Sequence, residues 1–313
     1  MNLDNAYLDK FVRATELAAY GASLYIGKND KIAADKGAVD KMRDQLNKID
    51  MDGTVVIGEG EMDEAPMLFI GEKVGTKIGQ KIDIALDPLE GTNFVAKNLP
   101  NAFSVIAAAN NNCLLNAPDT YMEKIVIGKN LPKNLLNLNN TVEKNINLLA
   151  EARNKKPNEL SACVLKRDRH NKIVEKLSKM NVNINFITDG DISGALSVVG
   201  DKPLNDIYLG IGGAPEGVLT AAALSCLDGQ MQARLVIREE EIDRAKKMGI
   251  KDHKKQYNID ELVKGDVIFC ASGITDGDLV KGIKDQGDKF EVQTLALHKS
   301  GNINKKIVNK IIK

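Results

Sequence analysis

Tryptophan is absent from this chain of 313 residues, and aromatic residues account for only 4% of it. Few side chains can therefore stack on the bases of a single-stranded nucleic acid. Lys plus Arg and Asp plus Glu both number 43, so no excess of positive charge attracts a nucleic acid or an anionic membrane surface. The composition predicts that neither nucleic acids nor membranes are partners of the protein.

Long apolar runs are missing as well. No stretch reaches the roughly 18 successive apolar residues of a membrane span, and residues 1–13 lack the continuous apolar region of a secretory signal. A cytoplasmic location is therefore expected. The cysteines are widely separated in mostly apolar surroundings, which favours reduced core residues over a zinc site or a disulfide framework: Cys113, Cys163, Cys226 and Cys270.

Hydrophobic residues make up 43% of the chain, enough for a substantial core in two domains or one large two-lobed unit. The second half alternates predicted strands and helices, which favours an open, largely parallel sheet covered by helices. The Asn-rich segment 129–140 is the predicted connection between an N-terminal α+β lobe, residues 1–140, and a C-terminal α/β lobe, residues 141–313. In an alternative arrangement, the C-terminal segment returns to the first lobe.

The apolar spacing and the turn residues place the individual elements. Helices are predicted over residues 8–19, 33–46, 171–180, 192–199 and 218–227, and strands over residues 54–57, 82–86, 103–108, 160–165, 182–187, 207–211 and 267–271.

Residues 83–92 read Asp-Ile-Ala-Leu-Asp-Pro-Leu-Glu-Gly-Thr. The apolar residues alternate as in a strand with one buried face, and Pro88 is predicted to end the ladder of strand hydrogen bonds. Gly91 permits an unusual backbone angle, so the chain can fold back. This turn would bring together the oxygen atoms of Asp87, the Leu89 carbonyl, Glu90 and Thr92. Hard cations such as Mg²⁺ or Mn²⁺ prefer oxygen ligands of this kind.

Two further acidic features precede this segment. Asp35 lies on the apolar face of its predicted helix, where a lone carboxylate is costly, and the ordinary alternative is a helix pair with Lys31. Glu59, Glu61 and Asp63 follow a predicted strand in a Gly-rich turn, where crowded acids repel unless a cation or water relieves them. A solvated acidic turn is the alternative. The order of strand, acidic turn, strand and second acidic segment favours a metal site.

The second half holds groups suited to an anion. Residues 208–217 place several glycines and Glu216 between a strand and a helix, which fits a phosphate cradle beside a metal-ligand acid. A purely structural helix cap is the alternative, whereas a nucleotide-binding fingerprint fits less well because Pro215 replaces its third glycine. The cations of residues 166–170 and the acids Asp189 and Asp191 follow successive strands, where open sheets bind ligands; ordinary surface charge and helix capping are the alternatives.

Together these segments resemble class II fructose-1,6-bisphosphatases. The Asp-Pro-x-acid-Gly-Thr element alone resembles the wider lithium-sensitive, metal-dependent phosphatases, which include inositol monophosphatase. The longer matches at residues 59–68 and 210–217 narrow the resemblance to the class II enzyme. The matches keep the family's order and cover nearly the whole chain, at residues 55–68, 83–92, 116–124, 189–191 and 210–217.

The resemblance implies a layered α/β/α/β/α sugar-phosphatase fold with two closely packed lobes. It also implies hydrolysis of the 1-phosphate of fructose 1,6-bisphosphate, which gives fructose 6-phosphate for gluconeogenesis. The implied cofactor is Mn²⁺ or Mg²⁺, which activates water directly and without a phosphoenzyme. A homo-oligomer, dimer or tetramer, is a further implication.

Carried over residue by residue, the resemblance assigns three groups of site residues. The catalytic candidates are Thr92, Glu61, Asp63 and Lys31. The substrate contacts are Glu90, Gly91, Thr92, Tyr121, Arg167, Asp168, Arg169, Asp189, Gly190, Asp191 and Gly213. The metal ligands or their immediate partners are Asp35, Glu59, Asp87, Leu89, Glu90 and Glu216.

One departure from the family and three rival functions qualify this assignment. Asp168 stands where the family usually has proline, and it adds an anion near the expected phosphate. Another sugar bisphosphate, such as sedoheptulose 1,7-bisphosphate, would need the same metal chemistry. Inositol or nucleotide monophosphatase activity fits the match at residues 210–217 less well. Retention of every proposed acid argues against a non-enzymatic metal- or nucleotide-binding regulator.

Overall fold

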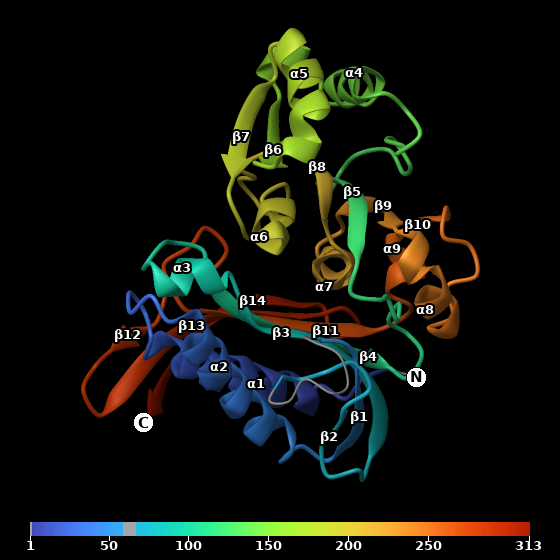
Figure 1. Ribbon diagram of the computed structural model, residues 1–313. Helices are drawn as coiled ribbons and strands as arrows, with labels where there is room; N and C mark the ends of the chain where they lie inside the picture. The colour runs from blue at the N-terminus through green and yellow to red at the C-terminus, as the bar shows by residue number, and fades with distance from the viewer. Residues whose placement is uncertain (1, 59–66) are drawn as a thin grey trace. The chain divides into compact units, whose positions relative to one another are not determined.

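The computed structural model describes residues 2–58 and 67–313, and the chain forms two compact units (Figure 1). Unit 1 comprises Met1–Leu115 and Val263–Lys313, and unit 2 comprises Asn116–Leu262. No helix within the described ranges is both long and apolar enough to cross a membrane.

Unit 1 combines three helices and eight strands in its described part. They are α1 (Ala6–Ser23), α2 (Lys31–Leu46), β1 (Met51–Ile57), β2 (Lys73–Val74), β3 (Gln80–Glu90), α3 (Thr92–Ala96), β4 (Phe103–Asn110), β11 (Val267–Gly273), β12 (Lys284–Asp285), β13 (Lys289–His298) and β14 (Ile303–Ile312).

The strands of unit 1 form one sheet. β1 runs parallel to β3, whereas β3 with β4, β4 with β11, β11 with β13 and β13 with β14 are antiparallel pairs. Helices α1 and α2 pack on each other and on one face of this sheet (Figure 1). Phe11 of α1, Met42 of α2 and Ile84 of β3 belong to the core between the layers and are fully buried. The two predicted opening helices and the first three predicted strands are confirmed.

Unit 2 is built from six strands and six α-helices, with short 3-10 turns between some of them. The strands are β5 (Tyr121–Ile127), β6 (Ser161–Leu165), β7 (Asn183–Ile187), β8 (Ile207–Gly213), β9 (Gln230–Val236) and β10 (Gln256–Asn258). The helices are α4 (Val142–Ala152), α5 (Asn171–Lys179), α6 (Asp191–Leu196), α7 (Ala214–Cys226), α8 (Ile242–Lys247) and α9 (Ile259–Leu262), and the 3-10 turns are η1 (Pro157–Glu159), η2 (Asp168–His170) and η3 (Glu239–Glu241).

The sheet of unit 2 has the strand order β10-β9-β5-β8-β6-β7. Only β6 with β7 and β6 with β8 are parallel, while β5 is antiparallel to both of its neighbours. The prediction of a largely parallel sheet is therefore wrong. Strands and helices alternate only from β6 to β8, and these three strands form the parallel part of the sheet. The apolar spacing did not reveal the strands at residues 121–127 and 230–236, which form the antiparallel part.

Helices cover both faces of this sheet. Alternate residues of β5 point to opposite faces, so Ile125 joins Ile146 of α4 and Leu177 of α5 in one core. On the opposite face Lys124 meets Asp191 at the start of α6, and α7 contacts β5, β8 and β9. Unit 2 is thus a three-layer α/β/α body, and unit 1 is a two-layer one.

The mixed α/β class predicted from the sequence is confirmed, whereas the five-layer order across the two units stays a prediction. The boundary expected after residue 140 falls inside unit 2, because β5 pairs with β8 and β9 of that unit. The C-terminal strands β13 and β14 belong to the sheet of unit 1. All four cysteines are reduced thiols, as expected, although Cys113 and Cys226 are only half-buried.

The α1–α2 contact depends on two facing glycines and yields a stability prediction. A Cβ atom at Gly21 would overlap the backbone carbonyl of Gly37, so Gly21→Ala must push the helices apart. Overpacking of this kind costs about 1–3 kcal/mol, and we expect a corresponding fall in the urea midpoint of unfolding. Lys36→Ala, which removes only an exposed ion pair on α2, is the control and should leave the midpoint nearly unchanged. A midpoint for Gly21→Ala equal to that of the wild type would refute the contact.

Candidate functional site

The end of strand β3 carries three predicted metal ligands, Asp87, the carbonyl of Leu89 and Glu90. The pairing of β3 with β4 is regular up to Asp87, opposite Val105, and resumes at Glu90, opposite Phe103, after a shift in register. The prediction that Pro88 ends the ladder is wrong, because Pro88 lies in an irregularity, where a missing N–H costs no ladder bond. The strand therefore delivers Asp87 and Glu90 from either side of this break.

The chain turns sharply directly after Glu90. Gly91 adopts φ 87°, in the left-handed region, and caps the short helix α3, of which Thr92 is the first residue. The unusual angle predicted for Gly91 is confirmed. Asp87 accepts a hydrogen bond from the backbone N–H of Leu89 at 2.9 Å, and Glu90 is only 5% exposed. Asp87, Glu90 and Thr92 are thereby held on a tight backbone segment.

Asp35 of helix α2 lies in the electrostatic field of Asp87. Burial, and secondarily the charge of Asp87, raises the pKa of Asp35 to about 6. Its Oδ1 atom is buried and has no hydrogen-bond partner among the described residues. Lys31 is exposed and forms no ion pair with Asp35 in the described structure, so the helix-pair alternative is wrong. The helix instead begins at Asp30, whose side chain accepts a hydrogen bond from the N–H of Ala33.

These acids fit a hard divalent cation. One oxygen of Asp35 is buried without a hydrogen-bond donor in the described part of the chain, and the charge of Asp87 helps to raise the pKa of the Asp35 carboxyl. A bound positive charge would stabilise both carboxylates. Within residues 2–58 and 67–313, no three His, Cys, Asp or Glu side chains are grouped as a complete metal site. The predicted ligand Glu59 and the catalytic candidates Glu61 and Asp63 lie outside the described residues, so the described part of unit 1 contains only some of the predicted site residues.

In unit 2, three predicted substrate residues meet at one end of the sheet. Tyr121, the first residue of β5, pairs with Gly213, the last residue of β8. Arg169 donates from Nε and Nη2 to the carbonyl of Ile211, at 3.0 and 2.8 Å, and its guanidinium lies 4.8 Å from the centre of the Tyr121 ring. The side chains of Tyr121 and Arg169 are exposed. An exposed, fixed guanidinium beside an aromatic ring suits a phosphorylated sugar.

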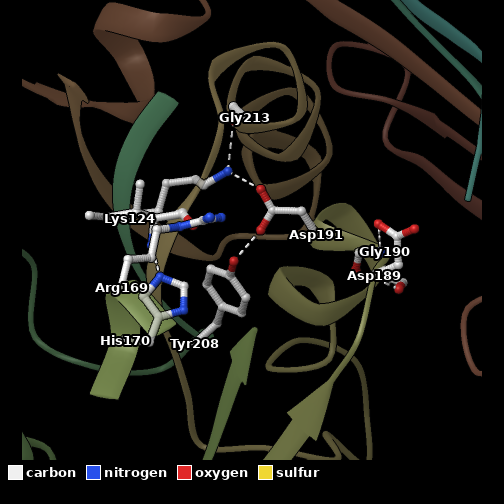
Figure 2. Close-up of polar contacts among 10 residues, drawn as sticks. Lys124, Arg169, His170, Asp189, Gly190, Asp191, Tyr208 and Gly213 are labelled. Atoms are coloured by element: carbon white, nitrogen blue, oxygen red, sulfur yellow. Dashed lines mark hydrogen bonds and ion pairs between the residues drawn. The ribbon is translucent and has the colours of Figure 1, made fainter. Parts of the chain in front are cut away.

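Beneath this end of the sheet lies a buried ion pair (Figure 2). Lys124 of β5, 1% exposed, donates to the carboxylate of Asp191 and, at 2.8 Å, to the carbonyl of Gly213. Tyr208 of β8 donates its hydroxyl to the other oxygen of Asp191. Burial, followed by the charge of Asp191, raises the pKa of Tyr208 well above its ordinary value, so its hydroxyl stays protonated and remains a donor.

The other predicted substrate residues of unit 2 differ in accessibility. Asp191 is 6% exposed and both of its carboxylate oxygens accept hydrogen bonds inside the unit, whereas the carboxylate of Asp189 lies apart from this network (Figure 2). Gly190 adopts φ 78° and begins helix α6. Arg167 and Asp168 are exposed on the turn after β6.

Glu216 lies in the first turn of helix α7, close to the backbone of Gly213. A Cβ atom at Gly213 would overlap the Glu216 carboxylate, so any larger residue here would displace that carboxylate from its present position. Pro215 occupies the first helical turn as predicted. The cap residue Gly213 has no side chain to offer, and the N–H of Ala214, the first residue of α7, donates to the carbonyl of Thr120 at 2.8 Å.

Sequence reasoning missed Lys124 and Tyr208. Lys124 follows Glu123 in the chain, and two successive charges are typical of a surface rather than of a core strand. A signal was nevertheless present: Met122, Lys124 and Val126 alternate on one face of β5, and all three are buried.

Comparisons with known proteins agree with the resemblance. Residues 5–311 match the model of a family described as bacterial fructose-1,6-bisphosphatase, glpX-encoded. The class 2 fructose-1,6-bisphosphatase of Haemophilus influenzae is 41% identical over 319 residues, which covers 97% of this chain and 95% of that protein. A Synechococcus protein, D-fructose 1,6-bisphosphatase class 2/sedoheptulose 1,7-bisphosphatase, is 38% identical over 321 residues, which covers 94% of this chain and 92% of that protein.

Among solved structures, an IMPase of Thermotoga maritima is 12% identical and has a TM-score of 0.33. The match covers 62% of this chain and 73% of that chain, and it is too slight to carry an argument.

The buried ion pair predicts a large effect of Lys124→Met. Asp191 would keep only the Tyr208 hydroxyl, and stranding one partner of a buried pair costs about 3–5 kcal/mol of unfolding free energy. Urea unfolding should therefore shift strongly, and the double variant Lys124→Met/Asp191→Asn should recover part of the loss. Lys179→Met, which breaks an exposed ion pair on α5, is the matched control. Equal midpoints for Lys124→Met and Lys179→Met would contradict the structure.

Proposed function

The chain belongs to the bacterial, glpX-encoded fructose-1,6-bisphosphatase family, and we propose that it hydrolyses the 1-phosphate of fructose 1,6-bisphosphate to fructose 6-phosphate and phosphate in gluconeogenesis. The family match over residues 5–311 is the observation that carries this proposal. The arrangement at the end of β3 supports it, because Asp87, Glu90 and Thr92 are the groups that metal-assisted phosphate hydrolysis needs.

The proposed cofactor is Mn²⁺ or Mg²⁺. The residues that would hold it are Asp35, Glu59, Asp87, the carbonyl of Leu89, Glu90 and Glu216. When bound, a divalent cation supplies positive charge to the phosphate and to the leaving oxygen and makes a water molecule more acidic. The raised pKa of Asp35 supports its place in this set, since a bound cation removes the unfavourable charge that the raised pKa reports.

The side chains of unit 1 would orient the reaction. The Thr92 hydroxyl, at the first residue of α3, would hold the attacking water in line with the phosphorus, with Glu61 or Asp63 as the partner of that water. The water oxygen bonds to phosphorus while the bond from phosphorus to the sugar oxygen breaks, and a proton passes to that oxygen. Lys31, exposed in the first turn of α2, is a remaining catalytic candidate.

Residues at the sheet end of unit 2 would recognise the sugar and its second phosphate. Arg169 is the strongest candidate for the phosphate, because its guanidinium is already oriented by the Ile211 carbonyl and by the Tyr121 ring. The turn with Arg167 and Asp168 and the segment from Asp189 to Gly213 are the further proposed contacts. Glu90, Gly91 and Thr92 are the proposed contacts in unit 1.

Sedoheptulose 1,7-bisphosphate is a second candidate substrate. The Synechococcus relative carries both activities in its name, and the two sugars present the same reacting phosphate. We also propose a cytoplasmic enzyme that assembles as a dimer or tetramer. Phosphate release from a panel of both bisphosphates and of inositol monophosphate, each with Mg²⁺ and with Mn²⁺, tests the function. Release from none of them would overturn it.

Asp87→Asn is predicted to remove nearly all turnover of fructose 1,6-bisphosphate and to leave the fold intact. The change keeps an acceptor for the N–H of Leu89 but deletes the anionic charge offered to the cation. Phosphate release and the thermal unfolding midpoint are the two measurements.

The matched control lies on the same strand. Asp83 accepts hydrogen bonds from the N–H groups of Cys113 and Leu114, so Asp83→Asn retains an acceptor there and should keep most of the turnover. Wild-type turnover in Asp87→Asn would exclude Asp87 from the metal site.

Thr92→Ala is predicted to lower kcat by about 100-fold or more and to change metal affinity little. The hydroxyl is proposed to position the water, and a small misplacement of a reacting group costs about 10²-fold in rate. Phosphate release against Mn²⁺ concentration separates the two quantities. Thr92→Ser, which keeps the hydroxyl, should restore most of kcat, and unchanged kcat in Thr92→Ala would rule out the role.

A further inference from the structure

We propose that His170 is a positioning residue for substrate recognition: its buried ring joins the ends of β6 and β8 and thereby holds Arg169 beside Tyr121. This inference rests on the proposed function only in taking Arg169 as the group that binds the second phosphate.

The ring of His170 is fully buried and makes two short backbone contacts. Its Nδ1 atom lies 2.7 Å from the carbonyl oxygen of Leu165, and the N–H of Ile211 donates to its Nε2 atom, also at 2.7 Å. A carbonyl can only accept and an N–H can only donate, so the ring is neutral and carries its proton on Nδ1. Leu165 ends β6 and Ile211 belongs to β8, so one side chain bridges two strands.

The bridge replaces a strand ladder that stops early. β6 and β8 pair as parallel strands only at Ala162 with Ile207 and at Cys163 with Tyr208. Beyond these pairs the imidazole supplies the donor and the acceptor that a neighbouring strand would otherwise offer. Space for the ring comes from Gly210, whose φ is 150° and at which a Cβ atom would lie 3.0 Å from Nε2.

Arg169 depends on the same peptide segment of β8. The N–H of Ile211 is held by His170, and the carbonyl of Ile211 accepts the two hydrogen bonds from Arg169. The two residues are adjacent in the 3-10 turn η2, so the ring also fixes the backbone from which Arg169 projects. Loss of the ring would therefore free both the arginine and its acceptor, and Arg169 would leave the Tyr121 ring.

This arrangement gives substrate binding a pH dependence. Burial lowers the pKa of His170, the charge of Arg169 lowers it further, and Asp191 of α6 opposes the shift. Lys124 and Tyr208 are both bonded to Asp191, the charge of Asp191 also acts on the Cys163 thiol, and Glu216 acts on Tyr208. Protonation places a hydrogen on Nε2, which then cannot accept from Ile211. Because the pKa of His170 in the folded protein lies below its ordinary value of 6.5, the bridge is intact at pH 6.5 and is lost as the pH falls through that lowered pKa.

The test combines His170→Gln and His170→Asn with Arg169→Ala in the full chain. Each amide can replace one of the two hydrogen bonds of the His170 ring. Gln places a polar atom near the position of Nε2 and Asn near that of Nδ1, and neither side chain titrates. We expect KM for fructose 1,6-bisphosphate to rise about tenfold at pH 7.5 in both variants, with kcat changed less than threefold. The rise of KM at acid pH that is expected for the wild type should be absent. In the Arg169→Ala background the His170 changes should raise KM less than twofold further.

Controls separate positioning from loss of the fold and from failure of the proposed function. His253→Gln alters an exposed histidine of unit 2 and should leave KM and its pH profile unchanged. Circular dichroism confirms that each variant is folded, and calorimetric titration with fructose 1,6-bisphosphate measures binding without turnover. Absent turnover with intact wild-type binding would reject the function and leave the His170 comparison valid. Additive effects of His170 and Arg169 changes, an equal effect on kcat, or no binding by the wild type would overturn the inference.

Discussion

The end of the unit 2 sheet that carries Tyr121 depends on the buried pairing of Lys124 with Asp191. A lysine that is 1% exposed is tolerated only because its ammonium donates to a carboxylate and to the Gly213 carbonyl. Those bonds join β5, the start of α6 and the end of β8, and Tyr208 completes the set. The exposed residues Tyr121 and Arg169 thus project from a backbone that is held by the buried contacts of Lys124, Asp191 and Tyr208.

Unit 1 presents the same electrostatic problem with a different solution. In unit 2 the buried acid, Asp191, has a lysine beside it. In unit 1 the buried oxygen of Asp35 faces no donor among the described residues, and Asp87 adds a second negative charge. The chain itself supplies a cation to Asp191, whereas Oδ1 of the proposed metal ligand Asp35 has no donor among the described residues. This contrast is the one expected between an acid paired within the protein and an acid that binds a cation from solution.

The parts of the site that could be predicted from the sequence lie close together in the chain. The left-handed Gly91 and the acids around it form a local pattern, so the order of residues 83–92 is enough to indicate a metal site. Lys124 and His170 could not be assigned in this way, because their partners lie 67 and 41 residues away. The antiparallel strands of unit 2 were not predicted for the same reason. The spacing of apolar residues along the chain does not indicate which distant segments pair.

The glycine-rich segment from Tyr208 to Gly217 has a physical explanation that its motif alone does not give. A Cβ atom at Gly210 would crowd the His170 ring, one at Gly212 would overlap the Asp191 carboxylate, and one at Gly213 would overlap Glu216. Each glycine therefore makes room for a polar side chain from another segment or from the next turn. The glycines of this segment thus set how closely the His170 ring, the Asp191 carboxylate and the Glu216 carboxylate approach its backbone.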